Sequence, residues 1–397
     1  MDEPRYGWVV VWGAFFCLAL IFGVAYSFAA FFESFAHEFA AQRADVALVF
    51  GLSGLIYFVL GAGAGMLADR YGPRIVCSAG MLFIVGGLLA TSYARSMATV
   101  YLAYGVGIGV GVALVYTPAI ASVQPWFARR RGLAAGIASA GIGAGTIAIP
   151  LIAASAISAL EWRSALRAIA AGVLVAGLIA AFVLKRAPVA RGAQGEARAG
   201  ASLGEALRDR RFWWFYAYAL LAAPTMFIPF AHVSAAARDL GIGLTPGDSR
   251  AVGLVGLIGI GSLIGRFAIG ALADRLGRTL TLTLMQASMG ASYVLWGAAG
   301  GYVALAIFAL WFGLSYGGIV SLMPAICMDM FGARAVSSIV GTLYTGAALG
   351  NLLGPVVAGA VFDRSGSYAP VIWGCVALSV VGTAVAWRLV KSGAPVY

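Results

Sequence analysis

The stretch GMLADRYGPR at residues 65–74 recurs in outline as GALADRLGRT at residues 270–279, which begins 205 residues later. Each copy ends one long apolar run and begins the next. A charged hairpin at equivalent places in two halves of a very apolar chain is typical of a membrane protein with an internal duplication.

The composition points the same way. Hydrophobic residues make up 62% of the 397 positions, charged residues 10%, and the mean hydropathy is +0.94. A soluble core cannot hide that much apolar surface, so we expect the lipid bilayer to cover it. The net charge of +11 is spread over short loops instead of one polar domain, so we expect no nucleic-acid partner.

Turns and charges divide the chain into apolar runs of about 20 residues, the length that crosses a bilayer as a helix. We therefore expect an all-α membrane protein of twelve transmembrane helices in two pseudo-symmetric bundles of six. The domains are residues 1–187, a cytoplasmic linker at 188–211 and residues 212–397. The expected spans are 8–32, 46–68, 75–94, 97–122, 132–158, 164–184, 212–236, 251–272, 279–300, 302–327, 336–361 and 367–387.

The Lys and Arg residues orient the chain. Of the 26, 18 fall on the side of the N-terminus, seven fall on the opposite side, and Arg266 belongs to neither. Because cytoplasmic loops carry the excess of Lys and Arg, we expect both termini in the cytoplasm and a multi-pass protein of the plasma (inner) membrane.

Residues for enzyme chemistry or cofactors are scarce. Cys17, Cys77, Cys327 and Cys375 lie in or beside apolar spans without metal-ligand spacing. The two histidines are His37 and His232, and there is no phosphate-binding loop. We expect neither an enzyme nor a bound cofactor or metal.

The paired hairpins, twelve spans and central loop resemble the major facilitator superfamily over nearly the whole chain. Pro-Ala-Ile at 118–120 and at 324–326 repeats with an offset of 206, close to the hairpin offset. The resemblance implies that Asp69 meets the N-terminus of the helix that follows Arg334 when the carrier faces outward. The hairpin residues then form a conformational latch, unless they are only tight turns that fix the topology: Asp69, Arg70, Arg74, Asp274, Arg275 and Arg278.

Arg266 is the most telling single residue. It lies eight residues before Asp274, which places it about 12 Å inside the membrane. An arginine there costs at least about 2.5 to 3.5 kcal/mol, so it should face a wet cavity and meet an anion. No Asp or Glu lies at that depth in any expected span. The anion is then a carboxylate cargo, unless backbone carbonyls or tyrosine hydroxyls satisfy the guanidinium.

Depth counting finds companions for Arg266. Four tyrosines fall near the middle of their spans and serve either as carboxylate ligands or as packed aromatics: Tyr57, Tyr116, Tyr316 and Tyr344. The side chains available to contact an apolar tail are Phe22, Phe28, Phe227 and Phe267.

The stretch WFARRRGLAAGIASAG at 126–141 resembles the monocarboxylate transporter family, as does YGW at 6–8 in part. Arg266 stands where that family and the related oxalate:formate antiporter place their substrate arginine, which implies carboxylate binding. Two positions depart from the family: Ser262 replaces an Asp one turn earlier, and Ala29 or its neighbours replace a first-helix Lys. We expect Ser262 and Phe267 to join Arg266 in binding the substrate. Residues 336–361 also lack the antiporter's second cation, which favours a monocarboxylate over a dicarboxylate.

We therefore expect a monomeric secondary transporter of small lactate- or pyruvate-like monocarboxylates, with alternating access around Arg266. The resemblance implies a proton as coupling ion. His232 is a weak candidate to titrate, because it falls near the outer end of its helix, where an interfacial histidine is expected. The alternatives are dicarboxylate exchange, a sugar or drug carrier, a nontransporting receptor and a channel.

Overall fold

The computed structural model describes residues 5–127, 130–187, 200–245, 247–332 and 334–391. The N-half consists of α1 (Arg5–Glu38), α2 (Arg43–Tyr71), α3 (Pro73–Ser92), α4 (Met97–Val100), the π-helix η1 (Tyr101–Val106), α5 (Gly107–Val123), the 3-10 helix η2 (Gln124–Trp126) and α6 (Arg131–Phe182). The C-half consists of α7 (Leu203–Arg208), α8 (Arg210–Asp239), α9 (Arg250–Leu276), α10 (Arg278–Gly297), α11 (Tyr302–Phe331), α12 (Val336–Ser365) and α13 (Ala369–Lys391).

Each expected span coincides with a helical segment of the structure. Within the described residues, ten helices are long and apolar enough to cross a membrane by length and composition. The long helix α6 holds two expected spans, 132–158 and 164–184, on either side of a kink at Glu161, whose φ is 64°. The 20-residue helix α10 matches the expected span 279–300 and is not among the ten. The expected all-α membrane architecture is confirmed.

The two hairpins share one backbone conformation. Gly72 has φ 91° and ψ 149°, and Gly277 has φ 86° and ψ 142°. Each glycine ends one helix and begins the next. Only glycine adopts this region without strain, so the repeated glycine accounts for the repeated sharp turn.

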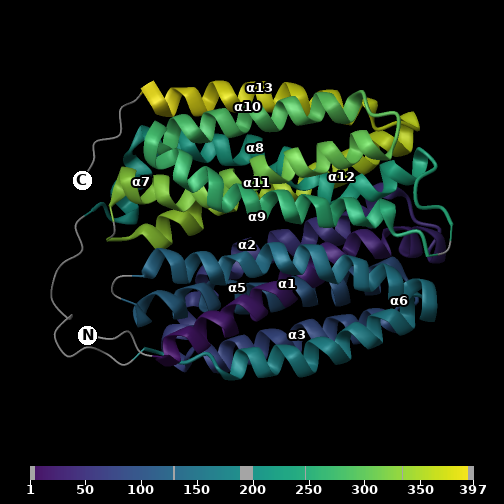
Figure 1. Cartoon of the computed structure of the whole chain (residues 1–397), viewed down its shortest axis with the longest axis horizontal. Helices are drawn as coiled ribbons and strands as arrows, with labels where there is room; N and C mark the ends of the chain where they lie inside the picture. The colour runs from purple at the N-terminus through teal and green to yellow at the C-terminus, as the bar shows by residue number, and fades with distance from the viewer. Residues whose placement is uncertain (1–4, 128–129, 188–199, 246, 333, 392–397) are drawn as a thin grey trace.

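The helices of each half pack mainly on one another (Figure 1). The two halves meet where α2 lies against α12 and where α6 lies against α9. We call this contact surface the seam. Because the spans alternate in direction, α1 begins and α13 ends at the same end of the bundle, at the left of Figure 1. We call it the terminal end and the opposite one the far end.

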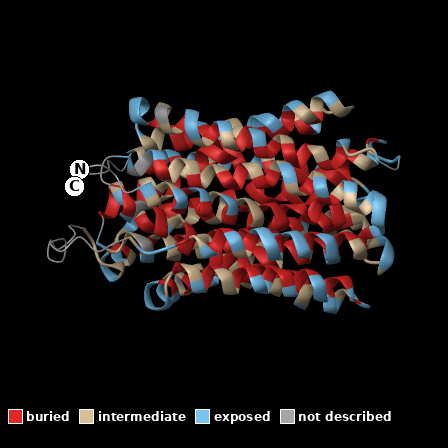
Figure 2. Cartoon of the chain, turned by 60° about the horizontal axis from the view of Figure 1, so that its bottom comes forward, coloured by how far each residue is buried: buried red, intermediate tan, exposed pale blue. Residues whose placement is uncertain are grey.

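Apolar side chains cover the outside as well as the inside. Buried residues fill the interior of both halves, while exposed positions lie along the outward faces of the helices (Figure 2). Large apolar side chains are among the exposed ones, such as Phe16 at 54%, Phe182 at 62% and Val303 at 71%. Lipid is the solvent that suits such a surface.

Part of the expected linker is described. Residues 188–199 lie outside the described residues. The remainder contains the short helix α7, where Ser202 and Glu205 form a capping box. Asp209 then accepts a hydrogen bond from the backbone N–H of Arg211 and caps the start of α8.

Candidate functional site

A cavity of about 50 Å³ lies at the seam, with walls from both halves. That space holds roughly three to five water molecules. Eight helices supply the walls: α1, α2, α5, α6, α8, α9, α11 and α12. The lining residues are Phe22, Tyr57, Phe58, Tyr116, Ile142, Ala219, Ala222, Met226, Phe227, Arg266, Tyr316, Val320, Met323, Tyr344 and Ala347.

Arg266 is the one charged residue among the described residues that line this cavity. It lies ten residues before the end of α9 at Leu276, about 15 Å along the helix axis. Its Nε is buried and has no hydrogen-bond partner in the described part of the chain. A guanidinium in this setting is a strong donor that lacks an acceptor.

The four tyrosines that depth counting selected all line the cavity: Tyr57, Tyr116, Tyr316 and Tyr344. Phenylalanines separate them. The ring centroids of Phe22 and Tyr116 lie 5.3 Å apart, and those of Phe58 and Tyr344 lie 5.6 Å apart. The result is an aromatic cage around one cation, with phenolic hydroxyls that can donate to an anion.

Three other selected residues lie outside the cavity lining. Phe267 is 52% exposed, and its ring lies beside Gly136 of α6. Phe28 is fully buried in the core of the N-half. Ser262 is buried where α9 and α11 approach closely, and its hydroxyl has no partner among the described residues. Residues adjacent to Arg266 along a helix point about 100° away from it, which explains the position of Phe267.

The far side of the cavity is closed by Tyr316 together with Tyr26 and Phe230, two aromatic residues that sequence analysis did not select. Tyr26 of α1 and Tyr316 of α11 form a hydrogen bond of 3.0 Å across the seam. The ring of Tyr26 stacks on Phe230 of α8 with centroids 4.2 Å apart. Tyr26 lies one helical turn beyond Phe22, so the same depth counting would have found it in the first span.

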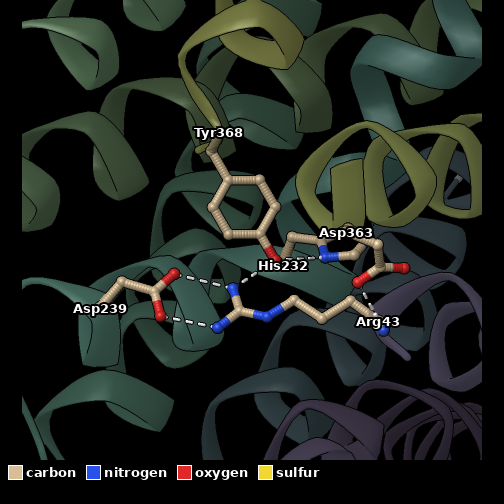
Figure 3. Close-up of polar contacts among 5 residues, drawn as sticks. All are labelled: Arg43, His232, Asp239, Asp363 and Tyr368. Atoms are coloured by element: carbon tan, nitrogen blue, oxygen red, sulfur yellow. Dashed lines mark hydrogen bonds and ion pairs between the residues drawn. The ribbon is translucent and has the colours of Figure 1, made fainter. Parts of the chain in front are cut away.

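A polar network holds the seam together nearer the far end, and Figure 3 shows its members Arg43, His232, Asp239, Asp363 and Tyr368. The Arg43 guanidinium donates to both carboxylate oxygens of Asp239, at 2.7 and 2.6 Å, and to the Tyr368 hydroxyl at 2.9 Å. Asp363 accepts the backbone N–H groups of Arg43 at 3.0 Å and Ala44 at 2.9 Å. We call these five residues the Arg43 network. It ties the start of α2 to α8, α12 and the turn before α13.

His232 is fully buried in this network, so the interfacial position expected from sequence is wrong. Its Nδ1 lies 2.9 Å from the Tyr368 hydroxyl, and its Nε2 lies 2.8 Å from the Pro355 carbonyl oxygen. Depth counting failed here because α8 continues to Asp239 and the helices α1 and α12 cover this face. Burial also raises the pKa of Tyr368, which therefore stays a neutral hydroxyl.

Among the residues that the structure describes, the two hairpins at the terminal end form no comparable network across the seam. Asp69 and Arg70 are exposed, and in the described part of the chain their side chains form no hydrogen bond or ion pair with α12. Arg74 stacks over Phe182 of its own half. Arg186 donates to the backbone carbonyls of Ala68 and Asp69. The first hairpin therefore contacts its own half here.

The second hairpin behaves in the same way. Arg278 forms an ion pair with Asp329 of α11, within the C-half. Asp274 and Arg275 are exposed. Among the described residues, none of the six expected latch residues forms a hydrogen bond or ion pair with the opposite half. The far end, by contrast, is tied across the seam.

Known proteins resemble this chain. A family model described as Major Facilitator Superfamily matches residues 14–355, with a second match over residues 225–396. Monocarboxylate transporter 13 of Bos taurus is 29% identical over 373 residues, covering 92% of this chain and 85% of the relative. Monocarboxylate transporter 4 of Rattus norvegicus is 27% identical over 380 residues, covering 92% of this chain and 79% of the relative.

Among solved structures, the chain resembles a bacterial homologue of the human lysosomal transporter Spinster, in an inward-facing and unoccupied conformation. The TM-score is 0.77 at 15% identity, and the alignment covers 98% of each chain. At that identity the likeness concerns the fold alone.

Proposed function

Because the chain belongs to the major facilitator superfamily and is a membrane transporter, not an enzyme, we propose that it carries a small monocarboxylate bound by Arg266 in the cavity at the seam. The relatives named monocarboxylate transporters support this substrate class. The observation that carries the proposal is the unpartnered, buried Nε of Arg266.

A carboxylate suits this site chemically. Its two oxygens match the planar fork of a guanidinium, and charge-assisted hydrogen bonds contribute about 1.5 to 3 kcal/mol each. That offsets the cost of an arginine at mid-membrane depth. The hydroxyls of Tyr116 and Tyr316 border the same space and supply further donors. A neutral sugar would leave the guanidinium charge without a counterion.

The size and lining of the cavity favour one carboxylate with a short tail. A space of about 50 Å³ is far smaller than the pocket of a drug-sized ligand, which favours a small anion over a large one. A second cation for a dicarboxylate is not found among the described lining residues. Phe22, Phe58 and Phe227 offer apolar contact to the tail.

The polar ties at the far end, and hairpins whose described polar contacts stay within their own halves, favour an inward-facing state of an alternating-access cycle. In this proposal the terminal end is cytoplasmic, as the Lys and Arg distribution indicates, and the membrane is the plasma (inner) membrane. The chain acts as a monomer of two bundles, residues 1–187 and 212–397, joined by the linker 188–211. In this proposal a proton is transported together with the monocarboxylate.

Uptake by proteoliposomes tests the arginine. Radiolabelled monocarboxylates, a dicarboxylate and a sugar are offered with and without an inward proton gradient. Arg266→Gln loses the charge and Arg266→Lys loses the fork, so we expect each to reduce monocarboxylate uptake at least about tenfold. The matched control is Arg95→Gln, because Arg95 is an exposed arginine in the turn between α3 and α4.

Two results would contradict the proposal. Unchanged monocarboxylate uptake in both Arg266 variants would remove the arginine from the mechanism. Saturable uptake of the sugar with no uptake of any carboxylate would remove the substrate class.

A further inference from the structure

His232 is a buried titratable group that the cavity does not use. It lies on α8 with no exposed surface, and both of its ring nitrogens are within hydrogen-bond distance of groups from the interior of α12 and the turn before α13. Phe32 of α1 packs against the imidazole with ring centroids 5.6 Å apart. The imidazole therefore sits in the seam, where elements of both halves meet.

The partners fix where the imidazole carries its proton. The Pro355 carbonyl can only accept, so Nε2 carries the hydrogen. Nδ1 of a neutral ring then accepts from the Tyr368 hydroxyl. The Tyr368 oxygen in turn accepts from the Arg43 guanidinium. The three hydrogen bonds run in one direction, from Arg43 of the N-half through Tyr368 to His232, and all three groups are satisfied when His232 is neutral.

We propose that His232 is a proton-binding site of the transporter and that its protonation opens the seam at the far end. A proton taken from the outer solution binds to Nδ1 and turns this nitrogen from an acceptor into a donor. The Tyr368 hydroxyl then faces two donors, Nδ1–H and the Arg43 guanidinium, and its own hydrogen has lost its acceptor. The hydrogen bond between Tyr368 and His232 is reversed, and the buried Tyr368 hydrogen without an acceptor disfavours the closed arrangement.

Two charged groups act on the imidazole in opposite directions, because the Arg43 guanidinium disfavours a positive charge there and the Asp363 carboxylate favours one. Arg43 adds a cation on the other side of Tyr368, so a second positive charge on His232 is repelled. The carboxylates nearby are already engaged: Asp239 by the Arg43 guanidinium and Asp363 by the start of α2. Glu33 of α1 acts on Tyr368 electrostatically. No carboxylate oxygen is hydrogen-bonded to either ring nitrogen, since Tyr368 and Pro355 occupy both.

This inference deepens the proposed function, since it names the group that binds the coupling proton, and it rests on that proposal for its physiological meaning. The closed seam excludes the proton, so the closed state loses stability as the pH falls. Below about pH 6.5, where an accessible histidine titrates, the ratio of open to closed far ends should rise by up to about tenfold per pH unit. Outside acidity would thus expose the cavity to the side from which a proton and a carboxylate enter together.

Spin-label distances in nanodiscs test this directly. Labels at Ala98→Cys in the N-half and Leu244→Cys in the C-half lie at the far end, and both native residues are exposed. The four native cysteines are buried, and protein without the introduced cysteines serves as the background. The longer distance between the two labels marks molecules with an open far end. We expect the population of these molecules to rise at least about fivefold when the pH is lowered from about 8 to about 5.

The informative variant is His232→Gln. A glutamine keeps a donor for Pro355 and an acceptor for Tyr368 but does not titrate, so it should hold the far end closed at both pH values. Tyr368→Phe removes the hydroxyl between His232 and Arg43, so it should raise the open population at pH 8 and flatten the pH response. A pH response in His232→Gln equal to that of the parent would overturn the assignment, as would a parent protein that does not respond. These distance measurements contain no substrate, so their result does not depend on whether the protein transports a carboxylate. The proposed substrate is tested by the uptake experiment alone.

Discussion

The hydroxyl groups of Tyr26 in α1 and Tyr316 in α11 lie 3.0 Å apart and form a hydrogen bond across the seam. Tyr316 also lines the cavity, whereas Tyr26 stacks on Phe230 on its far side. The bond therefore joins the binding space to the closure of the far end. It must break whenever the two halves separate there.

Removing this bond should favour the open far end. In Tyr26→Phe the ring stack remains and one hydrogen bond of about 0.5 to 1.5 kcal/mol is lost, which raises the open population about two- to tenfold. The matched control is Tyr104→Phe, since the buried Tyr104 hydroxyl donates to the Val24 carbonyl within the N-half. That control should leave the far-end label distances unchanged. Equal shifts in both variants would show that the effect is a general loss of packing.

The cavity tyrosines should contribute less than the arginine. Tyr116→Phe keeps the edge contact with Phe22 and loses one donor, so we expect monocarboxylate affinity to fall about two- to tenfold. Binding measured by tryptophan quenching or by calorimetry reports this change. The comparison is Tyr293→Phe, whose hydroxyl donates to the Thr225 carbonyl away from the cavity lining. An unchanged affinity in Tyr116→Phe would leave Tyr116 as a packing residue.

Sequence periodicity located the helices, and it placed Arg266 well inside one of them, because both depend on distances along one chain. The hairpin glycines, the twelve runs and the tyrosines at mid-span are local features, and the structure places all four tyrosines on the cavity. Helix rotation was harder to infer. Phe267 follows Arg266 directly and has nearly the same depth, but its ring faces α6 and not the cavity. Residue depth alone does not distinguish these two directions.

Contacts across the seam could not be predicted from the sequence. Arg43 is separated from Asp239 by 196 residues and from Tyr368 by 325. No internal repeat relates the partners, because the duplication marks equivalent positions and not positions that touch. The burial of His232 likewise could not be predicted from the sequence, because it depends on α12 of its own half and on α1 of the other half.

The glycines of the fifth span should be required for packing. A Cβ at Gly145 would lie 1.9 Å from the Ala19 carbonyl oxygen, on the backbone of α1. Gly145→Ala should therefore lower the melting temperature of the purified protein by several degrees, as expected for overpacking of about 1 to 3 kcal/mol. The control is Gly172→Ala, where a Cβ has open space and no clash. A melting temperature that Gly145→Ala leaves unchanged would mean that α1 and α6 shift apart without cost.

The ion pair at the far end should also stabilise the closed state. Asp239→Asn loses the charge that faces the Arg43 fork, and because this pair is partly exposed we expect a two- to fivefold rise in the open population, about 0.5 to 1 kcal/mol. Asp248→Asn is the control, since Asp248 pairs with Arg250 in the loop before α9, within the C-half. Arg250 lowers the pKa of Asp248 to about 2, so this carboxylate is charged throughout the assay. High salt should diminish the Asp239 effect.

Asp69 should stabilise the state in which the terminal end is closed, whereas Asp239 stabilises the state in which the far end is closed. The Asp69 side chain is exposed and forms no hydrogen bond or ion pair with α12 in the described part of the structure, so its charge contributes little to the state seen here. We expect the Asp69 carboxylate to meet the N-terminus of α12 when the terminal end closes. Asp69→Asn loses this interaction with the helix dipole, which is worth about 0.3 to 1 kcal/mol, so the population with an open terminal end should rise up to about fivefold. Spin labels on the terminal end at Leu133→Cys and Trp387→Cys, both native residues being exposed, measure that population. Asp274→Asn, the equivalent position in the second hairpin, tests whether both copies share the role. A terminal-end distance that neither variant changes would leave the hairpins as turns that fix topology.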